Sequence, residues 1–415
     1  MSEVKETLKS PLRQALDRFV ANKPAVFGLF VIILSILVMA SGTLFLRDKT
    51  PDANNGDTRI HKKPPGYKVK VLKFIKDRDI DQVGFFTKLY WGQEDNYTIV
   101  PVEEFAIEGN QIKFVNCDRR KSSETATLIK AMRRINNDPP AQLRLDSIAN
   151  FVVEGDQITY ISPDNKVVSE SLSKLKKEFE TQLVEERYYP LGTDALGADM
   201  LSRLMLGTRV SLLIGFLAVL ISMLIGVPVG ALAGYMGGRV DALFMWLMTV
   251  VWSIPSIMLV IVISLALGSK EIWVIFVAVG FTMWGDVARV VRGQMLSIKE
   301  KLFIEAAKAF GMGNGRIIFK HVMPNITAPI IVTATANFAS AILIEAGLSF
   351  LGLGVQPPTP SWGQMVHEGF KALGSENSLH LILLPSICIW LLVLSFNLLG
   401  NGIKDAFLPS EGRKF

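Results

Sequence analysis

The amino-acid sequence predicts an all-α polytopic membrane protein with six transmembrane helices and one soluble α+β insert. Half of its 415 residues are hydrophobic, and the mean hydropathy of +0.34 is high for a soluble chain of this size. The apolar residues gather in long stretches without Asp, Glu, Lys or Arg, and about 20 such residues span a bilayer. These stretches are residues 24–46, 210–238, 242–269, 322–344 and 377–403. By contrast, residues 48–187 hold 23 basic and 23 acidic side chains, which is typical of a domain that folds in water.

Residues 1–23 are predicted to form a basic amphipathic segment on the cytoplasmic surface of the membrane. Leu12, Leu16, Phe19 and Val20 recur at helical spacing and share one face. The apolar stretch 24–46 is too long for a cleavable signal peptide. It is therefore predicted to be the first transmembrane helix.

Residues 188–403 are predicted to form the membrane core, with five further transmembrane helices. The third of these contains only 14 uncharged residues, 272–285, which is about 21 Å of helix. A re-entrant or buried helix is the alternative interpretation of that segment. The approximate bounds of the five helices are 208–236, 241–268, 272–290, 326–350 and 380–403.

The distribution of charge predicts the topology. The net charge of +6 lies outside the insert, in the N-terminal segment, at Arg239, between Arg289 and Lys320, and in the tail 404–415. Cytoplasmic loops of membrane proteins collect Lys and Arg. Six spans with both termini in the cytoplasm place all these segments, including the loop 291–325, on the cytoplasmic side, and residues 47–187 outside. This topology explains the basic excess better than nucleic-acid binding does.

The insert, residues 47–187, carries two similar hairpin signatures. "FAIEGNQIKFV" (105–115) and "FVVEGDQITYI" (151–161) alternate apolar and polar residues around a glycine-containing turn. They are either a duplicated unit or two hairpins of one sheet. Residues 125–137 and 170–187 are predicted to be helices. We expect the insert to serve docking or assembly, and the alternatives are direct substrate binding or a dispensable decoration.

Catalytic, cofactor and metal sites are not predicted in this chain. None of the 33 glycines is followed by lysine, so the phosphate-binding loop of P-loop ATPases is missing. The four histidines show no metal-binding spacing. Cys117 lies in the predicted outer insert and Cys388 inside the last predicted span, so the two are not expected to pair. Within the spans, the best ionisable candidate for ion coupling is Glu345, which is expected near the outer mouth in contact with water or a neighbouring helix. The chain is therefore expected to depend on an external source of energy.

A cytoplasmic stretch between the fourth and fifth spans resembles a known signature. "EAAKAFGMGNGRIIFKHVMP" (305–324) resembles the coupling motif of ABC-importer permeases, in which E-A-A is followed by a glycine and, further on, by a closing proline. His321 and Met323 replace the usual Ile and Leu. The matching residues, with the lysine inside the motif, are Glu305, Ala306, Ala307, Lys308, Gly311 and Pro324.

Other stretches resemble the second, C-type permease subunit of dipeptide and oligopeptide importers. The longest is "YPLGTDALGADMLSRLMLGTRVSLLIG" (189–215), in which Tyr189 and Ala198 stand where that family usually has His and Arg. Residues 345–365 and 401–409 resemble the same subunit, whereas the large insert departs from it. The motif positions expected near the outer mouth are Gly192, Thr193, Asp194, Gly197, Asp199, Glu345, Gly352 and Gly354.

The resemblance implies a type I ABC-importer permease in a bacterial inner membrane. It implies a homologous second permease, two ABC ATPases that use ATP and Mg²⁺, and an extracytoplasmic solute-binding protein as partners, besides the bilayer. The cytoplasmic motif would be a helix that docks in a groove of the ATPase. Nickel, an opine or another small solute is an alternative cargo, and a membrane-anchored sensor or scaffold that acts through the insert is an alternative class.

Reporter fusions test the predicted topology. A reporter that is active only outside the membrane is expected to be inactive when fused after residue 415 and active when fused after residue 120, because the Lys and Arg distribution places the termini inside and the insert outside. The opposite pattern of activity would refute this topology.

Overall fold

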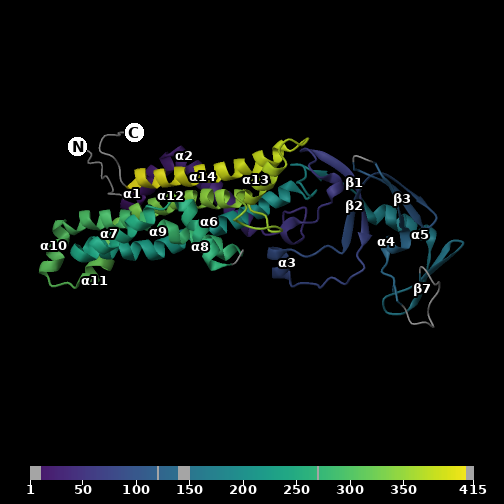
Figure 1. The fold of residues 1–415 in the computed structure, drawn as a ribbon, viewed down its shortest axis with the longest axis horizontal. Coiled ribbons are helices and arrows are strands. Elements are labelled where there is room, and N and C mark those ends of the chain that lie inside the picture. Colours follow the sequence, from purple (N-terminus) through teal and green to yellow (C-terminus); the bar gives the residue numbers. More distant parts are fainter. Residues whose placement is uncertain (1–10, 119–120, 139–149, 269–270, 408–415) are drawn as a thin grey trace, which may run out of the picture. The chain divides into compact units, whose positions relative to one another are not determined.

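The computed structural model describes residues 11–118, 121–138, 150–268 and 271–407 (Figure 1). The chain divides into two compact units. The helical unit consists of Met1–Ala40, Gly207–His367 and Leu383–Phe415, and the mixed unit of Ser41–Leu206 and Glu368–Ile382. We describe each by itself.

Long helices dominate the helical unit. Five helical segments are long and apolar enough to cross a membrane, and a sixth candidate is a pair of helices bent by 91°. The helices are α1 (Pro11–Ala21), α2 (Lys23–Ala40), α6 (Met200–Met236), α7 (Gly238–Trp252), α8 (Ser256–Leu267), α9 (Ile272–Lys299), α10 (Leu302–Ala309), α11 (Asn314–Ile317), the π-helical η5 (Ile318–Val322), α12 (Met323–Phe350), α13 (Trp362–Lys371) and α14 (Leu379–Phe407).

The break in a span occurs one helix earlier than the sequence predicts. α9 is an unbroken helix of 28 residues, so the short uncharged stretch 272–285 is part of a full span. Instead, the predicted helix 241–268 divides into α7 and α8 at Pro255, which lacks the backbone N–H that would continue the helix. Other bounds also differ from the prediction. The first span ends at Ala40, α6 begins at Met200, α9 ends at Lys299, and the fifth span belongs to a helix that begins at Asn314.

α9 lies at the centre of the helical unit, against α6, α8 and α12 (Figure 1). A stripe of Gly226, Gly230 and Gly234 faces it from α6. A Cβ atom on these glycines would lie only 2.4–2.6 Å from the nearest atom of α9. Small residues at such a spacing let two helix backbones approach closely inside a membrane.

The N-terminal amphipathic helix is present as α1. Leu16 and Val20 are exposed on it and Phe19 is half-buried, as suits a helix that lies on a surface. The Arg18 guanidinium donates a 3.5 Å hydrogen bond to the carbonyl of Ala406 near the end of α14. Residues 1–10 of the predicted segment lie outside the described residues.

The mixed unit contains two antiparallel sheets, with strand orders β4-β3-β2-β1-β8 and β5-β6-β7. One hydrophobic core serves both sheets and includes Leu72, Ile112, Ile158 and Phe179. The elements are η1 (Pro51–Ala53), η2 (Thr58–Ile60), β1 (Tyr67–Ile75), α3 (Phe85–Trp91), β2 (Tyr97–Glu108), β3 (Gln111–Asn116), β4 (Ser123–Thr127), α4 (Leu128–Met132), β5 (Phe151–Glu154), β6 (Gln157–Ile161), β7 (Val167–Ser171), α5 (Leu172–Glu178), the π-helical η4 (Phe179–Leu183) and β8 (Val184–Tyr189).

Both predicted hairpins form, and they belong to a duplicated unit rather than to one sheet. Each continues into a third strand and a short helix, as β2-β3-β4-α4 and β5-β6-β7-α5. The turn residue serves the helix in the same way in both copies. The side chain of Asn110 accepts a 3.2 Å hydrogen bond from the N–H of Ile129, and that of Asp156 accepts a 3.0 Å bond from the N–H of Ser173.

The two helices predicted in the insert are shorter than expected. Within 125–137, the residues up to Thr127 belong to β4, and only Leu128–Met132 is helical. Within 170–187, α5 and η4 end at Leu183, and Val184–Tyr189 forms β8, which pairs with β1. The edge of the sheet offers backbone partners that outweigh the helical preference of "VEER".

Candidate functional site

The first candidate site is the coupling segment, residues 300–324, which joins α9 to α12. α10 ends where the N–H of Phe310 bonds to the carbonyl of Ala306 at 3.0 Å and that of Met312 bonds to the carbonyl of Ala307 at 3.1 Å. Between them Gly311 has φ of +74°, a left-handed conformation that ends helices and favours glycine. The chain then turns into α11 and η5, and Pro324 stands in the first turn of α12.

The inner face of α10 is anchored to the helical unit. Ile304 and Ala307, one turn apart, are buried and share a cluster with Met295 of α9 and Ile326 of α12. Figure 1 shows α10 and α11 together at one end of the helical unit. The position of α10 is therefore fixed by the ends of two long helices.

The remaining apolar side chains of the segment are exposed. Leu302 is 82% exposed, Phe310 83% and Phe319 77%. Phe303 and Ala306 are exposed as well. We call Leu302, Phe303, Ala306, Phe310 and Phe319 the coupling patch. Large exposed apolar groups gathered in one short segment indicate a protein-binding surface.

Polar contacts tie the coupling segment to the end of α6. The Tyr235 hydroxyl donates a 3.0 Å hydrogen bond to the side chain of Asn314, and the Lys308 ammonium lies 5.9 Å from the centre of the Tyr235 ring. On the neighbouring helices, Arg292 of α9 forms a two-pronged ion pair with Asp241 of α7. The ends of α6, α7 and α9 are thus linked to one another and to this segment.

The predicted coupling residues do not all face outward. Glu305, Ala306, Lys308, Gly311 and Pro324 are exposed. Ala307 is buried against its own chain instead, so its small size serves packing within the subunit. Of the two alanines, only Ala306 is open to a partner.

The second candidate site is the polar turn, residues 192–203, which precedes and begins α6. Gly192 and Gly197 have φ of +77° and +81°. A Cβ atom on Gly192 would lie 2.3 Å from the carbonyl oxygen of Lys63, and one on Gly197 would lie 1.9 Å from that of Asp57. Both positions therefore require glycine, because of backbone conformation and close approach.

The side chain of Thr193 fastens this turn to the insert. Thr193 is fully buried. Its hydroxyl donates to the carbonyl of Ile60 at 2.5 Å and accepts from the N–H of Lys63 at 2.9 Å. His380 donates through Nε2 to the carbonyl of Thr193 at 3.1 Å. The turn thus joins chain segments that are far apart in sequence.

A buried charge cluster completes the turn. Asp194 accepts 2.8 Å hydrogen bonds from the N–H groups of Leu196 and Ala198 and forms an ion pair with Arg203. Arg203 also lies 3.1 Å from a carboxylate oxygen of Glu368. The side chains of Asp194 and Arg203 are each 5% exposed, so neither charge is solvated by bulk water. Sequence reasoning singled out Asp194 but missed Arg203, whose i+9 spacing is no helical signal.

Asp199 caps the N-terminus of α6. Its Oδ2 accepts hydrogen bonds from the N–H and the hydroxyl of Ser202, at 3.1 and 2.6 Å. Burial raises the pKa of the Asp199 carboxyl above its usual value, while the bonds from Ser202 oppose this shift. A structural role in starting α6 accounts for this residue.

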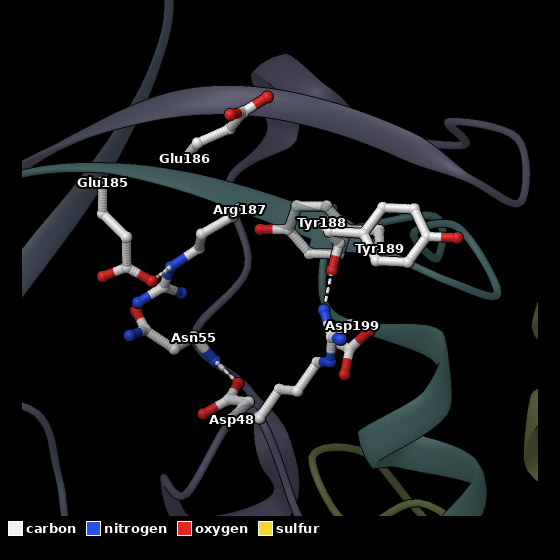
Figure 2. A pocket seen from close by; sticks show the side chains of 9 residues that line it. Asp48, Asn55, Glu185, Glu186, Arg187, Tyr188, Tyr189 and Asp199 are labelled. Atoms are coloured by element: carbon white, nitrogen blue, oxygen red, sulfur yellow. Dashed lines mark hydrogen bonds and ion pairs between the residues drawn. The ribbon is translucent and has the colours of Figure 1, made fainter.

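Asp199 also lines an open cavity of about 430 Å³ in the mixed unit (Figure 2). Residues of both charges surround this cavity, which belongs to the insert and the polar turn. The Arg47 guanidinium lies 5.4 Å from the centre of the Tyr188 ring, and Asp48 accepts a 2.8 Å bond from the N–H of Asn55. The lining residues are Arg47, Asp48, Asn55, Glu185, Glu186, Arg187, Tyr188, Tyr189 and Asp199.

The other predicted outer-mouth residues belong to the helical unit. Glu345 is buried, so of the two surroundings expected for it, water or a neighbouring helix, only packing inside the protein remains. Its Oε1 accepts a 2.8 Å hydrogen bond from Ser349, whose hydroxyl in turn accepts from the N–H of Val355 at 3.2 Å. A Cβ atom on Gly354 would lie 2.0 Å from the Ser349 hydroxyl. Gly352 lies in the turn that follows α12. This group therefore fixes the loop after α12.

Among the residues that the structure describes, no group of His, Cys, Asp or Glu is arranged to hold a metal ion. The first site presents an exposed apolar surface, and the second consists of buried polar contacts that hold the fold.

Known protein families match most of the membrane core of this chain and its N-terminal segment. Residues 226–411 match the family described as the inner membrane component of binding-protein-dependent transport systems. Residues 10–65 match the N-terminal transmembrane domain of oligopeptide transport permease C.

Several relatives are about 40% identical to this chain over the aligned residues. The oligopeptide permease OppC of Haemophilus influenzae is 41% identical over 54% of this chain and 72% of its own length. The dipeptide permease DppC of Bacillus subtilis is 41% identical over 54% and 69%. OppC of Escherichia coli is 40% identical over 55% and 74%. Among solved structures, a chain of the inward-facing MetNI methionine ABC transporter aligns with 49% of this chain and 97% of its own, at 19% identity and a TM-score of 0.41.

Replacing Arg203 tests the buried charge cluster. Arg203→Met leaves Asp194 buried without its ion-pair partner and is expected to lower the free energy of unfolding by about 3–5 kcal/mol. The loss is measured as a lower midpoint of thermal unfolding in detergent.

Arg59→Met is the matched control, because Arg59 pairs with Asp57 and Glu124 at a more exposed position. Surface pairs contribute about 0–1 kcal/mol. Equal shifts of the midpoint in the two variants would show that the charge cluster is not a special source of stability.

Proposed function

The chain belongs to the family of inner membrane components of binding-protein-dependent transport systems, as a C-type permease subunit, and we propose that it forms half of an import pathway for di- or oligopeptides. The relatives that it matches are named oligopeptide, dipeptide and glutathione permeases, which supports peptides as the cargo. Nickel, an opine or another small solute is the alternative. Binding assays on the cognate solute-binding protein decide between them.

The coupling patch is the observation that carries this proposal. A subunit without an ATP site of its own needs a surface through which an ATPase can move it. The patch offers exposed aromatic and aliphatic side chains on a helix whose opposite face is anchored to the transmembrane helices. Aromatic residues dominate the energetics of such interfaces. A sensor or scaffold that acted through the insert would have no use for this surface.

The contacts suggest how a movement of the ATPase reaches the pathway. A displacement of α10 is passed through Ile304 and Ala307 to the ends of α9 and α12. The pair of Arg292 with Asp241 carries it from α9 to α7, and α7 meets α8 at the 91° bend. Because packed side chains leave few voids, a shift of one helix end forces its neighbours to move.

The proposed assembly follows from the family. This subunit pairs with a homologous permease in a type I arrangement, and the two bind a pair of ABC ATPases on the cytoplasmic side. ATP and Mg²⁺ bind to those ATPases, so this chain is a transport subunit and not an enzyme. An extracytoplasmic solute-binding protein delivers the peptide. Both termini and α10 face the cytoplasm of the bacterial cell, and residues 47–187 lie outside its inner membrane.

Substitutions in the coupling segment test the proposed function. Phe310→Ser removes an aromatic side chain of the patch, and the loss of such an anchor costs on the order of 2 kcal/mol, or about thirtyfold in Kd. Glu305→Lys and Gly311→Pro are expected to abolish co-purification of the ATPase and peptide uptake, while insertion into the membrane is unchanged.

Glu300→Lys is the matched control, because Glu300 is an exposed acidic residue at the C-cap position of α9, just before α10 and outside the coupling patch. It is expected to keep ATPase association. Wild-type association in Phe310→Ser, Glu305→Lys and Gly311→Pro alike would contradict the proposed coupling role.

A further inference from the structure

The connection between β1 and β2 carries a short aromatic helix that buries none of its side chains. Four of the seven residues of α3, "FFTKLYW", are aromatic, and none of the seven is buried. Phe85, Phe86 and Trp91 are 74%, 75% and 68% exposed. A helix of this length has little stability of its own in water, and apolar side chains gathered at one place on a surface mark a binding site. Something outside this unit is therefore expected to cover α3.

The position of α3 is fixed by the chain that immediately follows α2. The N–H of Thr43 donates a 2.8 Å hydrogen bond to the carbonyl of Leu89, and its hydroxyl donates a 3.0 Å bond to that of Lys88. At the other side, the N–H of Gln93 bonds to the carbonyl of Lys49 at 3.0 Å. Figure 1 shows α3 standing apart from the β-sheet on this connection.

Covalent connection keeps α3 close to the end of a transmembrane helix. α2 ends at Ala40, and the three residues from there to Thr43 span at most about 11 Å. α2 has 18 residues, about 27 Å of helix, which nearly equals the hydrocarbon thickness of about 30 Å. Ala40 is thus expected at the edge of the hydrocarbon, and α3 at the depth of the lipid headgroups.

Two residues that follow α2, Leu44 and Phe45, are apolar and exposed, as the aromatic side chains of α3 are. They directly follow Thr43, the threonine that binds α3. Trp and Tyr concentrate at membrane–water interfaces, because their rings are apolar and carry one polar group. Helices that lie in the interface carry Trp, Phe and Leu on the face that enters the membrane. Lys88, in the middle of α3, has a side chain long enough to reach lipid phosphates.

We propose that α3, with Leu44 and Phe45, lies in the headgroup region of the bilayer and anchors the insert to the membrane surface. This location of α3 requires only that α2 spans the membrane. That α3 lies in the outer leaflet rests on the proposed function. Such an anchor fixes the height of the insert above the membrane, so that the insert presents a constant surface to whatever docks there.

Depth-dependent fluorescence quenching tests this anchor in the full-length protein. Phe86→Cys is labelled with bimane in lipid nanodiscs that contain spin-labelled lipids with a shallow or a deep doxyl group. We expect several-fold stronger quenching by the shallow group than at a control label on Lys130→Cys, an exposed position of the short helix α4. The unsubstituted protein, with Cys117 and Cys388, supplies the background.

Native tryptophan gives a second readout without a label. The difference in emission between the wild type and Trp91→Phe is the emission of Trp91. Brominated lipids are expected to quench the Trp91 emission and so to reduce this difference. Both readouts are independent of transport, so a failed uptake assay leaves them unaffected.

Three outcomes would overturn the proposal. The label could be open to aqueous iodide and no more sensitive to lipid than the control, which would show that α3 projects into water. It could be shielded from lipid and iodide in the permease alone, which would show that α3 packs on its own chain. It could become shielded only when the solute-binding protein or the second permease is added, which would make α3 a protein-docking helix.

Discussion

The packing of Ile304 and Ala307 onto the ends of α9 and α12 is the contact on which the rest of this account depends. It gives α10 one face held by the membrane helices and leaves the opposite face for another protein. In the proposed coupling role, a partner bound to the exposed aromatic side chains moves the membrane helices only through this inner contact. The glycine stripe of α6 has the same importance further along α9, because it keeps two helices too close for either to move alone.

In the mixed unit, polar interactions hold distant chain segments in place at the polar turn. The polar turn uses backbone geometry that only glycine allows, a buried threonine and a buried charge cluster to join the start of α6 to the insert. Buried polar groups are costly unless they are fully paired, so this turn tolerates little change. The described contacts of the motif that resembles the peptide-permease signature hold the turn and the start of α6 in place. The duplicated β-β-β-α units of the insert are attached to this support through β1 and β8.

The sequence predicted those features that depend on local patterns, and it failed where distant segments decide. Hydropathy located the spans, and alternation around Gly109 and Gly155 located both hairpins. By contrast, "VEER" became β8 because β1 lies beside it. The break at Pro255 has a local cause, but hydropathy alone does not reveal it, because the residues on both sides are apolar. The resemblance points to residues 305–324 as a coupling motif, which stays a prediction, and it did not show that Ala307 is buried. Arg203 was missed because its second partner, Glu368, lies 165 residues away. For Glu345 the sequence left contact with water or with a neighbouring helix open, and its burial excludes water.

The most direct test of the account is the number of peptides transported per ATP hydrolysed, measured in proteoliposomes that contain the complete importer with the Ile304→Ala permease. Ile304 is fully buried, and its truncation loosens the inner contact of α10 while the coupling patch keeps its side chains. The account predicts that the ATPase still binds and hydrolyses ATP, while the ratio of peptide to ATP falls several-fold. An unchanged ratio, with wild-type binding of the ATPase, would contradict the claim that this contact transmits the movement.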